Sequence, residues 1–207
     1  KMVMVSDLDD GEEDGGKQGK KKKKPAKVIN YASMDAGAVV LETSEHSKGF
    51  HKLLLDDKDK YGITECSEKK MVVIGLSEDI QMRELILCQY EKYSSGVKDF
   101  DVLGSQTFPT KEWLHLGNFS AKYGAREQAF ALDEPKYVRY IKLRFLTHHG
   151  DEASCTVSQL KVHGVTVMEG FQDDLQRHHD ELEQQQALIG TDDLVLGDLD
   201  VDAAAAA

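Results

Sequence analysis

Short apolar runs separated by turn-forming residues recur at intervals of roughly 10 to 14 residues between Val28 and Gly170. Runs of this length suit β-strands, and their regular spacing is typical of a β-sandwich. We predict strands over residues 70–76, 84–90, 99–103, 113–119, 128–132, 137–146 and 156–163. The residues alone therefore predict an all-β fold in one domain of ordinary size.

The run from Tyr137 to Leu146 has the clearest alternation of these strands. Successive side chains of a strand point to opposite faces, so every second residue shares a side. The side that begins at Tyr137 continues through Ile141, Leu143 and Phe145 and is mostly apolar. Arg139 interrupts this side, and we assign it to a strand end.

After Gly170 the apolar residues follow a longer period. Phe171, Leu175, Leu182 and Ile189, together with His178 and Gln185, fall at alternating steps near 3.5 residues, which predicts a helix over 171–190. His178 and Gln185 lie on the same seam and argue against an autonomous coiled coil. Two interpretations stay open: a helix that docks on a partner, or a solvated helical tail.

The flanks carry most of the excess charge in a chain whose net charge is −11. Residues 1–27 are expected to form a disordered charged linker, and residues 191–207 an acidic tail. The run Lys20 to Lys24 is either part of a solvated linker or a patch for nuclear import or lipid headgroups. The acidic balance disfavours nucleic acid as a partner.

No stretch approaches the roughly 18 uncharged apolar residues of a membrane helix, and no secretory leader is recognisable. Membrane attachment, if present, is expected through chain outside this sequence. The three cysteines have no CxxC spacing and allow at most one disulfide plus one free thiol.

Few residues suggest chemistry. No nucleophile signature accompanies the histidines, and adjacent pairs such as His148-His149 point to opposite faces of a strand, so we predict no enzyme, no cofactor and no metal site. Trp113 belongs either to the core or to a sugar-binding face. Asn118 opens an N-x-Ser sequon, which predicts glycosylation if the domain faces a lumen.

Several ordered motifs between residues 28 and 170 resemble a SUN domain. The first half has Asn30-Tyr31-Ala32-Ser33, Gly37-Ala38-x-Val40-Leu41, Glu65-Cys66-Ser67 and Ser94-Ser95-x-x-Lys98-Asp99-Phe100. The second half has Phe108-Pro109-Thr110-x-x-Trp113, Arg126-x-Gln128, Tyr140-Ile141-Lys142, His148-x-Gly150-x-Glu152-x-x-Cys155 and Val162-His163-Gly164. The resemblance is to the SUN-like branch, which comprises the Slp and ossification-factor types.

This resemblance implies a jelly-roll β-sandwich of the galactose-binding-like type, here with a helical extension, over residues 28–170. It implies a binding module in the endoplasmic reticulum or the contiguous nuclear envelope that is tethered to a membrane and recognises a membrane or luminal protein. It also implies a Cys66–Cys155 disulfide with Cys88 reduced. The motif residues are expected to be structural, with Phe100 in the core and Asp99 accepting backbone hydrogen bonds from the turn 94–98.

Departures from the family pattern shift the expected interface. SUN domains that capture KASH tails have tyrosines two positions on either side of the second cysteine, where this chain has Ala153 and Val157. The loop that holds a potassium ion is also short. We therefore do not expect KASH binding, and we predict that Phe171, Leu175, Leu182 and Ile189 bind the partner. A carbohydrate-binding module is the alternative function.

Overall fold

The computed structural model describes residues 28–192 of the 207-residue chain, without the side chains of residues 173, 174 and 186–192. The predicted linker 1–27, with its lysine run, and all of the predicted acidic tail except residues 191 and 192 lie outside the described part.

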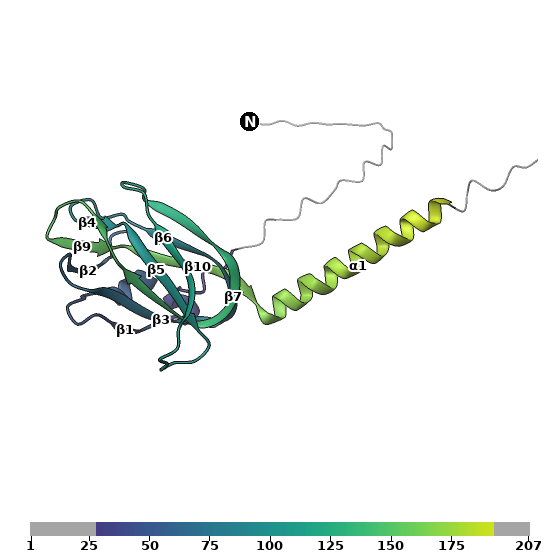
Figure 1. Cartoon of the computed structure of the whole chain (residues 1–207), viewed down its shortest axis with the longest axis horizontal. Helices are drawn as coiled ribbons and strands as arrows, with labels where there is room; N and C mark the ends of the chain where they lie inside the picture. Colours follow the sequence, from purple (N-terminus) through teal and green to yellow (C-terminus); the bar gives the residue numbers. More distant parts are fainter. Residues whose placement is uncertain (1–27, 193–207) are drawn as a thin grey trace, which may run out of the picture.

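Two β-sheets make up the body of the molecule (Figure 1). The larger contains β1 (Val39–Thr43), β3 (Lys70–Cys88), β7 (Glu127–Phe145), β5 (Asp99–Ser105) and β6 (Leu114–Ser120) in this order, and β10 (Gln159–Thr166) pairs with the second half of β3. The smaller has the order β2 (Gly62–Glu65), β9 (Ser154–Val157), β4 (Ser95–Val97) and β8 (His148–His149). The predicted all-β fold with a C-terminal helix is confirmed.

Two strands are longer than the sequence pattern predicts. Strands β3 and β7 each join two predicted strands across a stretch rich in polar residues, 77–83 in β3 and 133–136 in β7. The β3–β7 pairing shifts register between Gly75 and Ile80 and again between Met82 and Glu84. Such irregularities let a strand bend without ending, so polar residues that resemble turns remain inside the strand.

The same irregularity changes which residues of β7 face the core. Val138 pairs with Ile80 and is buried, whereas Tyr137 is 38% exposed. Beyond the register shift the buried residues are Ile141, Leu143 and Phe145. Arg139 therefore lies inside β7 where the alternation changes phase, and our assignment of it to a strand end is wrong.

Aromatic packing fills the centre of the sandwich. Phe100 on β5 has no exposed surface, and its ring centroid lies 5.1 Å from that of Phe130 and 5.6 Å from that of Phe119. Phe145 on β7 lies 6.5 Å away and connects this group to Phe50 of the short 3-10 helix η2 (Phe50–Leu54). A second 3-10 helix, η1 (Met34–Ala36), leads into β1.

The helix α1 (Val167–Asp192) begins four residues before the predicted start at Phe171. Glu169 accepts the backbone N–H of Thr166 at 2.8 Å, and the Thr166 Oγ1 atom accepts the N–H of Glu169 at 3.2 Å. This reciprocal arrangement is a capping box, which satisfies N–H groups that a helix start leaves unpaired. Because the cap fixes the helix start, the boundary between sandwich and helix lies at Thr166.

Within residues 28–192, no helix combines the length and the apolar character required to cross a membrane.

Candidate binding surfaces

The Cys155 region joins two strands of the smaller sheet through a disulfide. Cys66, which follows β2, is bonded to Cys155 on β9. The buried Lys70 donates through Nζ to the carbonyl oxygens of Cys66 at 2.7 Å and Glu68 at 2.8 Å. Burial lowers the pKa of Lys70. The disulfide therefore belongs to a loop that polar bonds also hold in place.

Neither position that carries a tyrosine in KASH-binding domains offers a side-chain donor here. Val157 is only 4% exposed and packs in the core. Ala153 is exposed, and its carbonyl accepts the N–H of Cys66 at 2.8 Å. An incoming carboxylate would find no hydroxyl at either position.

A groove of about 310 Å³ lies beside this region, and we call it the loop groove. It is lined by residues of the β3–β4 and β6–β7 connections together with His149 and Glu152. Tyr123 is 80% exposed, and its ring lies 5.5 Å from that of His149. Gln89 donates to Thr156 Oγ1 at 2.9 Å, but its Oε1 atom is buried without a hydrogen-bond partner among residues 28–192. The groove thus offers an aromatic surface, whereas the buried Gln89 Oε1 atom is not accessible to a ligand.

Hydrogen bonds position one carboxylate of the loop groove. Ser95 donates through its hydroxyl to Glu152 Oε2 at 2.7 Å, and this bond, with backbone N–H groups, lowers the pKa of Glu152. Gly150, with φ +83°, permits the turn between His149 and Glu152, because a Cβ atom there would lie 2.3 Å from Glu152 Oε2. The Gly150 motif position therefore shapes the groove's edge.

The motif residues of the chain's first segment attach it to β10. Asn30 accepts through Oδ1 the N–H groups of Ala32 at 3.0 Å and Val162 at 2.9 Å. Tyr31 is buried and donates its hydroxyl to Glu169 Oε2 at 3.1 Å. Burial and this bond raise the pKa of Tyr31 to about 12. Asn30 and Tyr31 therefore fix the chain beside the base of α1.

Gly164 allows a close approach of two strands. A Cβ atom at this position would lie 2.4 Å from the carbonyl oxygen of Gln81, at the register shift between His163 and Gly164. Only glycine fits such contact with backbone without a shift of the strand.

The Lys98-Asp99-Phe100 motif differs in part from expectation. Phe100 is in the core, and Lys98 is exposed. Asp99 accepts the Thr147 hydroxyl at 2.6 Å, and its pKa is lowered by hydrogen bonds from Thr147 and Ser120. Asp99 therefore joins β5 to the segment after β7 and to β6. Its predicted bonds to the turn 94–98 are wrong, because the carboxylate accepts hydrogen bonds from Thr147 and Ser120 instead.

Trp113 and Asn118 lie near opposite ends of β6. Trp113 precedes the strand and is half-buried, with Lys142 Nζ 5.5 Å from its ring centroid, so it is neither a full core residue nor an exposed platform. Asn118 is exposed, and its Oδ1 atom lies 2.8 Å from His115 Nε2. The sequon is therefore accessible from solvent.

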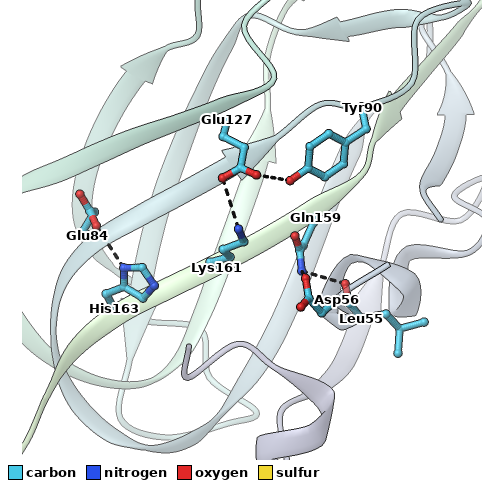
Figure 2. Close-up of polar contacts among 8 residues, drawn as sticks. All are labelled: Leu55, Asp56, Glu84, Tyr90, Glu127, Gln159, Lys161 and His163. Carbon is cyan, nitrogen blue, oxygen red and sulfur yellow. Dashed lines mark hydrogen bonds and ion pairs between the residues drawn. The ribbon is translucent and has the colours of Figure 1, made fainter. Parts of the chain in front are cut away.

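A row of polar side chains crosses the outer face of β10 and its neighbours (Figure 2). Glu127 accepts the Tyr90 hydroxyl and lies 3.3 Å from Lys161 Nζ, while His163 Nδ1 lies 3.1 Å from Glu84 Oε2. The Tyr90 bond is the main cause of the lowered pKa of Glu127. At the end of the row, Gln159 donates to the Leu55 carbonyl and to Asp56. Because these groups satisfy one another, we interpret the row, including the motif residue His163, as structural.

The helix α1 projects away from the sandwich and exposes apolar side chains (Figure 1). Phe171, Leu175 and Leu182 are 62%, 55% and 46% exposed. Val167 and Met168 extend this stripe to the base of the helix. The predicted partner-binding residue Ile189 lies in α1, but its side chain is outside the described part. Two exposed acids, Glu181 and Glu183, lie on either side of the stripe.

The structure places metal-ligating side chains together at one point of the sandwich. His148 lies close to Cys66 and Cys155, with their ligand atoms within 4.8 Å of one another. His149 instead lies 2.8 Å from the Ala121 carbonyl, on the loop-groove side. The two histidines do diverge, as predicted, but sequence spacing gave no indication of the distant cysteines beside His148.

Comparison with known proteins identifies relatives of the sandwich. Residues 43–166 match the family described as Sad1/UNC-like C-terminal. SUN domain-containing protein 4 of Arabidopsis thaliana is 45% identical over 72% of this chain and 25% of its own length. The human SUN domain-containing ossification factor is 36% identical over 74% of this chain and 13% of its own length. The chain thus spans a quarter or less of these two relatives.

Solved structures share the fold at low sequence identity. The family 32 carbohydrate-binding module of Streptococcus pneumoniae EndoD has a TM-score of 0.52 and 16% identity, and the match covers 66% of this chain and all of the module. Allantoicase of Saccharomyces cerevisiae has a TM-score of 0.55 and 21% identity over 69% of this chain and 45% of its own. These similarities confirm the jelly-roll β-sandwich of the galactose-binding-like type.

Proposed function

The chain belongs to the Sad1/UNC-like C-terminal family, the SUN domains, and from this premise we propose that it is a non-enzymatic protein-interaction domain. Its partner in this proposal is a membrane protein or a luminal client protein of the endoplasmic reticulum. The SUN domain-containing relatives support the family part of this proposal.

The exposed apolar stripe of α1 is the observation that carries the proposal. Five apolar side chains between Val167 and Leu182 are each 46% to 71% exposed on one described helix. An amphipathic helix of this kind binds by laying its apolar side chains into a groove of a partner. The acids beside the stripe favour a groove with a lysine or arginine rim.

The base of α1 is held firmly enough to present this stripe in a fixed direction. Tyr31 and Thr166 both bond to Glu169, and the Gly170 Cα lies close to the Tyr137 hydroxyl, since a Cβ there would be 3.4 Å from it. A pre-oriented helix loses less conformational freedom on binding than a free one.

The Cys155 region is a weaker candidate for the interface. Val157 is buried and Ala153 carries no donor, so a peptide carboxylate would lose its hydration there without compensation. We therefore do not propose a KASH tail as the ligand. Nucleic acid is not proposed either, because the net charge of −11 would repel it.

The disulfide and the size of the relatives support the proposed location. Disulfides persist in oxidising compartments such as the lumen of the endoplasmic reticulum. The relatives extend well beyond the matched segment, which leaves room for membrane attachment elsewhere in a longer chain.

The test compares two surfaces in the full-length native protein. Membrane and luminal proteins that co-purify with the parent are identified, and their recovery is measured with Phe171→Ala/Leu175→Ala/Leu182→Ala and with Ala153→Arg. We expect the helix variant to lose the partner and the Ala153 variant to retain it, with both as stable as the parent in thermal melts. Loss with Ala153→Arg alone would move the interface to β9.

Carbohydrate binding is the second candidate, favoured by the exposed Tyr123 ring beside His149 in the loop groove. Aromatic rings next to polar groups suit sugar rings, and one structural neighbour is a carbohydrate-binding module. A glycan array probed with parent and Tyr123→Ala distinguishes the candidates. Selective binding that Tyr123→Ala removes would favour the sugar, and no binding would favour the protein partner.

A further inference from the structure

Cys66, His148 and Cys155 come from three separate segments and meet beside β9. Cys66 follows β2, His148 forms part of β8, and Cys155 lies within β9. The two sulfur atoms and a ring nitrogen of His148 all lie within 4.8 Å of one another. Ligand atoms around one tetrahedral Zn²⁺ ion are separated by roughly 3.5 to 4 Å, given metal–ligand distances of about 2.0 to 2.3 Å. The two sulfur atoms are bonded to each other in this structure. If that bond were broken, a small movement of the sulfurs away from each other would give the spacing that zinc requires.

The space beside the cluster is close to the size of one water molecule. A cavity of about 10 Å³ adjoins the cluster and is lined by His148, Cys155, Thr64, Thr147 and Lys70 among others. This volume approaches the minimum that a single water molecule requires.

The three ligands would stay close together without the S–S bond. The N–H of Cys66 bonds to the Ala153 carbonyl, and β2 pairs with β9 along four residues on each strand. Lys70 Nζ holds the carbonyls of Cys66 and Glu68. On the other side, β8 pairs with β4 at His148. Backbone pairing therefore positions the ligands independently of the disulfide.

We propose that reduction of the Cys66–Cys155 disulfide creates a zinc site formed by both cysteines and His148, with water as the fourth ligand. A dithiol supplies two electrons and two protons: the S–S bond breaks, each sulfur gains a proton, and the dithiol becomes a cyclic disulfide. Zinc binding then releases one proton from each thiol to solvent. The same strands are joined by a covalent bond in the oxidised state and by a metal ion in the reduced state.

Charge and ligand type agree with this assignment. Two thiolates balance the charge of Zn²⁺. Cysteine and histidine are the side chains that tetrahedral zinc sites use most.

The experiment follows Co²⁺ binding by the full chain. The protein is reduced with a phosphine, which ends as the phosphine oxide with oxygen from water, and is then freed of reductant without air. We expect one equivalent of Co²⁺ to give thiolate-to-cobalt charge-transfer and tetrahedral ligand-field bands, which one equivalent of Zn²⁺ removes. The oxidised protein should show neither. Nitrogen and oxygen ligands on α1, such as His179 and Glu183, give no thiolate band.

Two neighbouring substitutions make a matched pair. His148→Gln should weaken Co²⁺ binding by about tenfold or more, since even outer-shell changes cost 10- to 100-fold. His149→Gln removes the adjacent histidine, which contacts Ala121 and Tyr123 instead, and should bind like the parent. Cys88→Ala should also bind like the parent. Absence of the bands in the reduced parent, or equal binding by the two glutamine variants, overturns the proposal.

If His148→Gln does not fold, X-ray absorption of the reduced zinc form of the parent replaces the comparison of variants. It should report two sulfur atoms at about 2.3 Å and nitrogen or oxygen at about 2.0 to 2.1 Å. A shell of oxygen and nitrogen alone would contradict the site.

Discussion

At the scale of single residues, Phe100 contributes most visibly to the packing of the sandwich. Its ring lies beside three aromatic rings from two other strands, β6 and β7, and has no exposed surface. Phe100→Ala should lower the free energy of unfolding by about 3 to 5 kcal/mol, through lost burial and the cavity left behind. Phe171→Ala removes an exposed ring from α1 and should change it by no more than about 0.5 kcal/mol. Urea unfolding of both variants measures this, and equal midpoints would contradict our placement of Phe100.

Asn118 gives a prediction about modification at the same scale. Its side chain is exposed on β6, so a glycan there would displace no core residue. Protein from the native source should carry one N-glycan at Asn118 that both Asn118→Gln and Ser120→Ala abolish. Electrophoretic mobility before and after glycosidase treatment is the measurement, and unchanged mobility of the parent would refute the modification.

At the scale of elements, the start of α1 should depend on pH. Hydrogen bonds from the Thr166 N–H, the Thr166 hydroxyl and Tyr31 lower the pKa of Glu169 below its ordinary value of 4.5. Because this pKa is lower in the folded state than in the unfolded state, the ionised Glu169 carboxylate stabilises the folded state fully above pH 4.5. This stabilisation is lost as the pH falls through the lowered pKa. The first turn of α1 should therefore be most protected at neutral pH.

Glu169→Gln tests this dependence. At neutral pH the variant keeps the capping box but loses the negative charge beside the helix start, and it should lose about 0.3 to 1 kcal/mol of local stability, measured as faster amide hydrogen exchange in residues 167–171. At about pH 3 the parent and the variant should converge. Glu181→Gln, on the exposed part of the same helix, should match the parent at both pH values. A constant difference between parent and Glu169→Gln would show that the carboxylate charge is unimportant.

The sequence patterns predicted which strands and helices form better than they predicted where each one begins and ends. The spacing of apolar runs was enough for an all-β fold, because alternation and turns are local properties. The lengths of β3 and β7 were not predictable, because residues such as Asp133 and Pro135 resemble a turn and remain in the strand only through its irregular pairing. The helix start could have been predicted, since Thr166-x-x-Glu169 is a recognisable capping-box sequence.

Among the candidate sites, those formed by residues close together in the sequence were predictable, and those formed by distant segments were not. The exposed stripe on α1 follows from a short-range period, and Phe171, Leu175 and Leu182 lie where the spacing predicts. The loop groove and the cluster around His148 join segments far apart in sequence, so no spacing indicates them. In the sequence, Tyr123 is only one residue of an expected turn, so nothing indicated that it would line a groove.

At the scale of the whole molecule, the disulfide closes a long loop between the smaller sheet's strands. Cys66 and Cys155 are 89 residues apart, and in the chain-entropy model a cross-link over this distance stabilises by about 4 to 5 kcal/mol. Cys66→Ser/Cys155→Ser should therefore unfold at a markedly lower urea concentration than the parent.

Peptide mapping without reductant checks the same bond directly. It should recover Cys66 linked to Cys155 and Cys88 as a free thiol. Cys88 is buried, and burial raises its pKa, so alkylation should be slow until the protein unfolds. Free thiols at Cys66 and Cys155 in protein from the native source would contradict the pairing.

The position of Tyr31 next to Glu169 has a mechanical consequence. The chain enters and leaves the sandwich at one corner (Figure 1), where the Tyr31 N–H bonds to the Val162 carbonyl at 2.9 Å. Tension on the two flanking segments would therefore load the bonds of this corner one after another, as in peeling, and would not shear the long ladder between β3 and β7. Bonds loaded singly give way at lower force than bonds loaded together. Under load the corner would open first and lengthen the chain while the sandwich stayed folded.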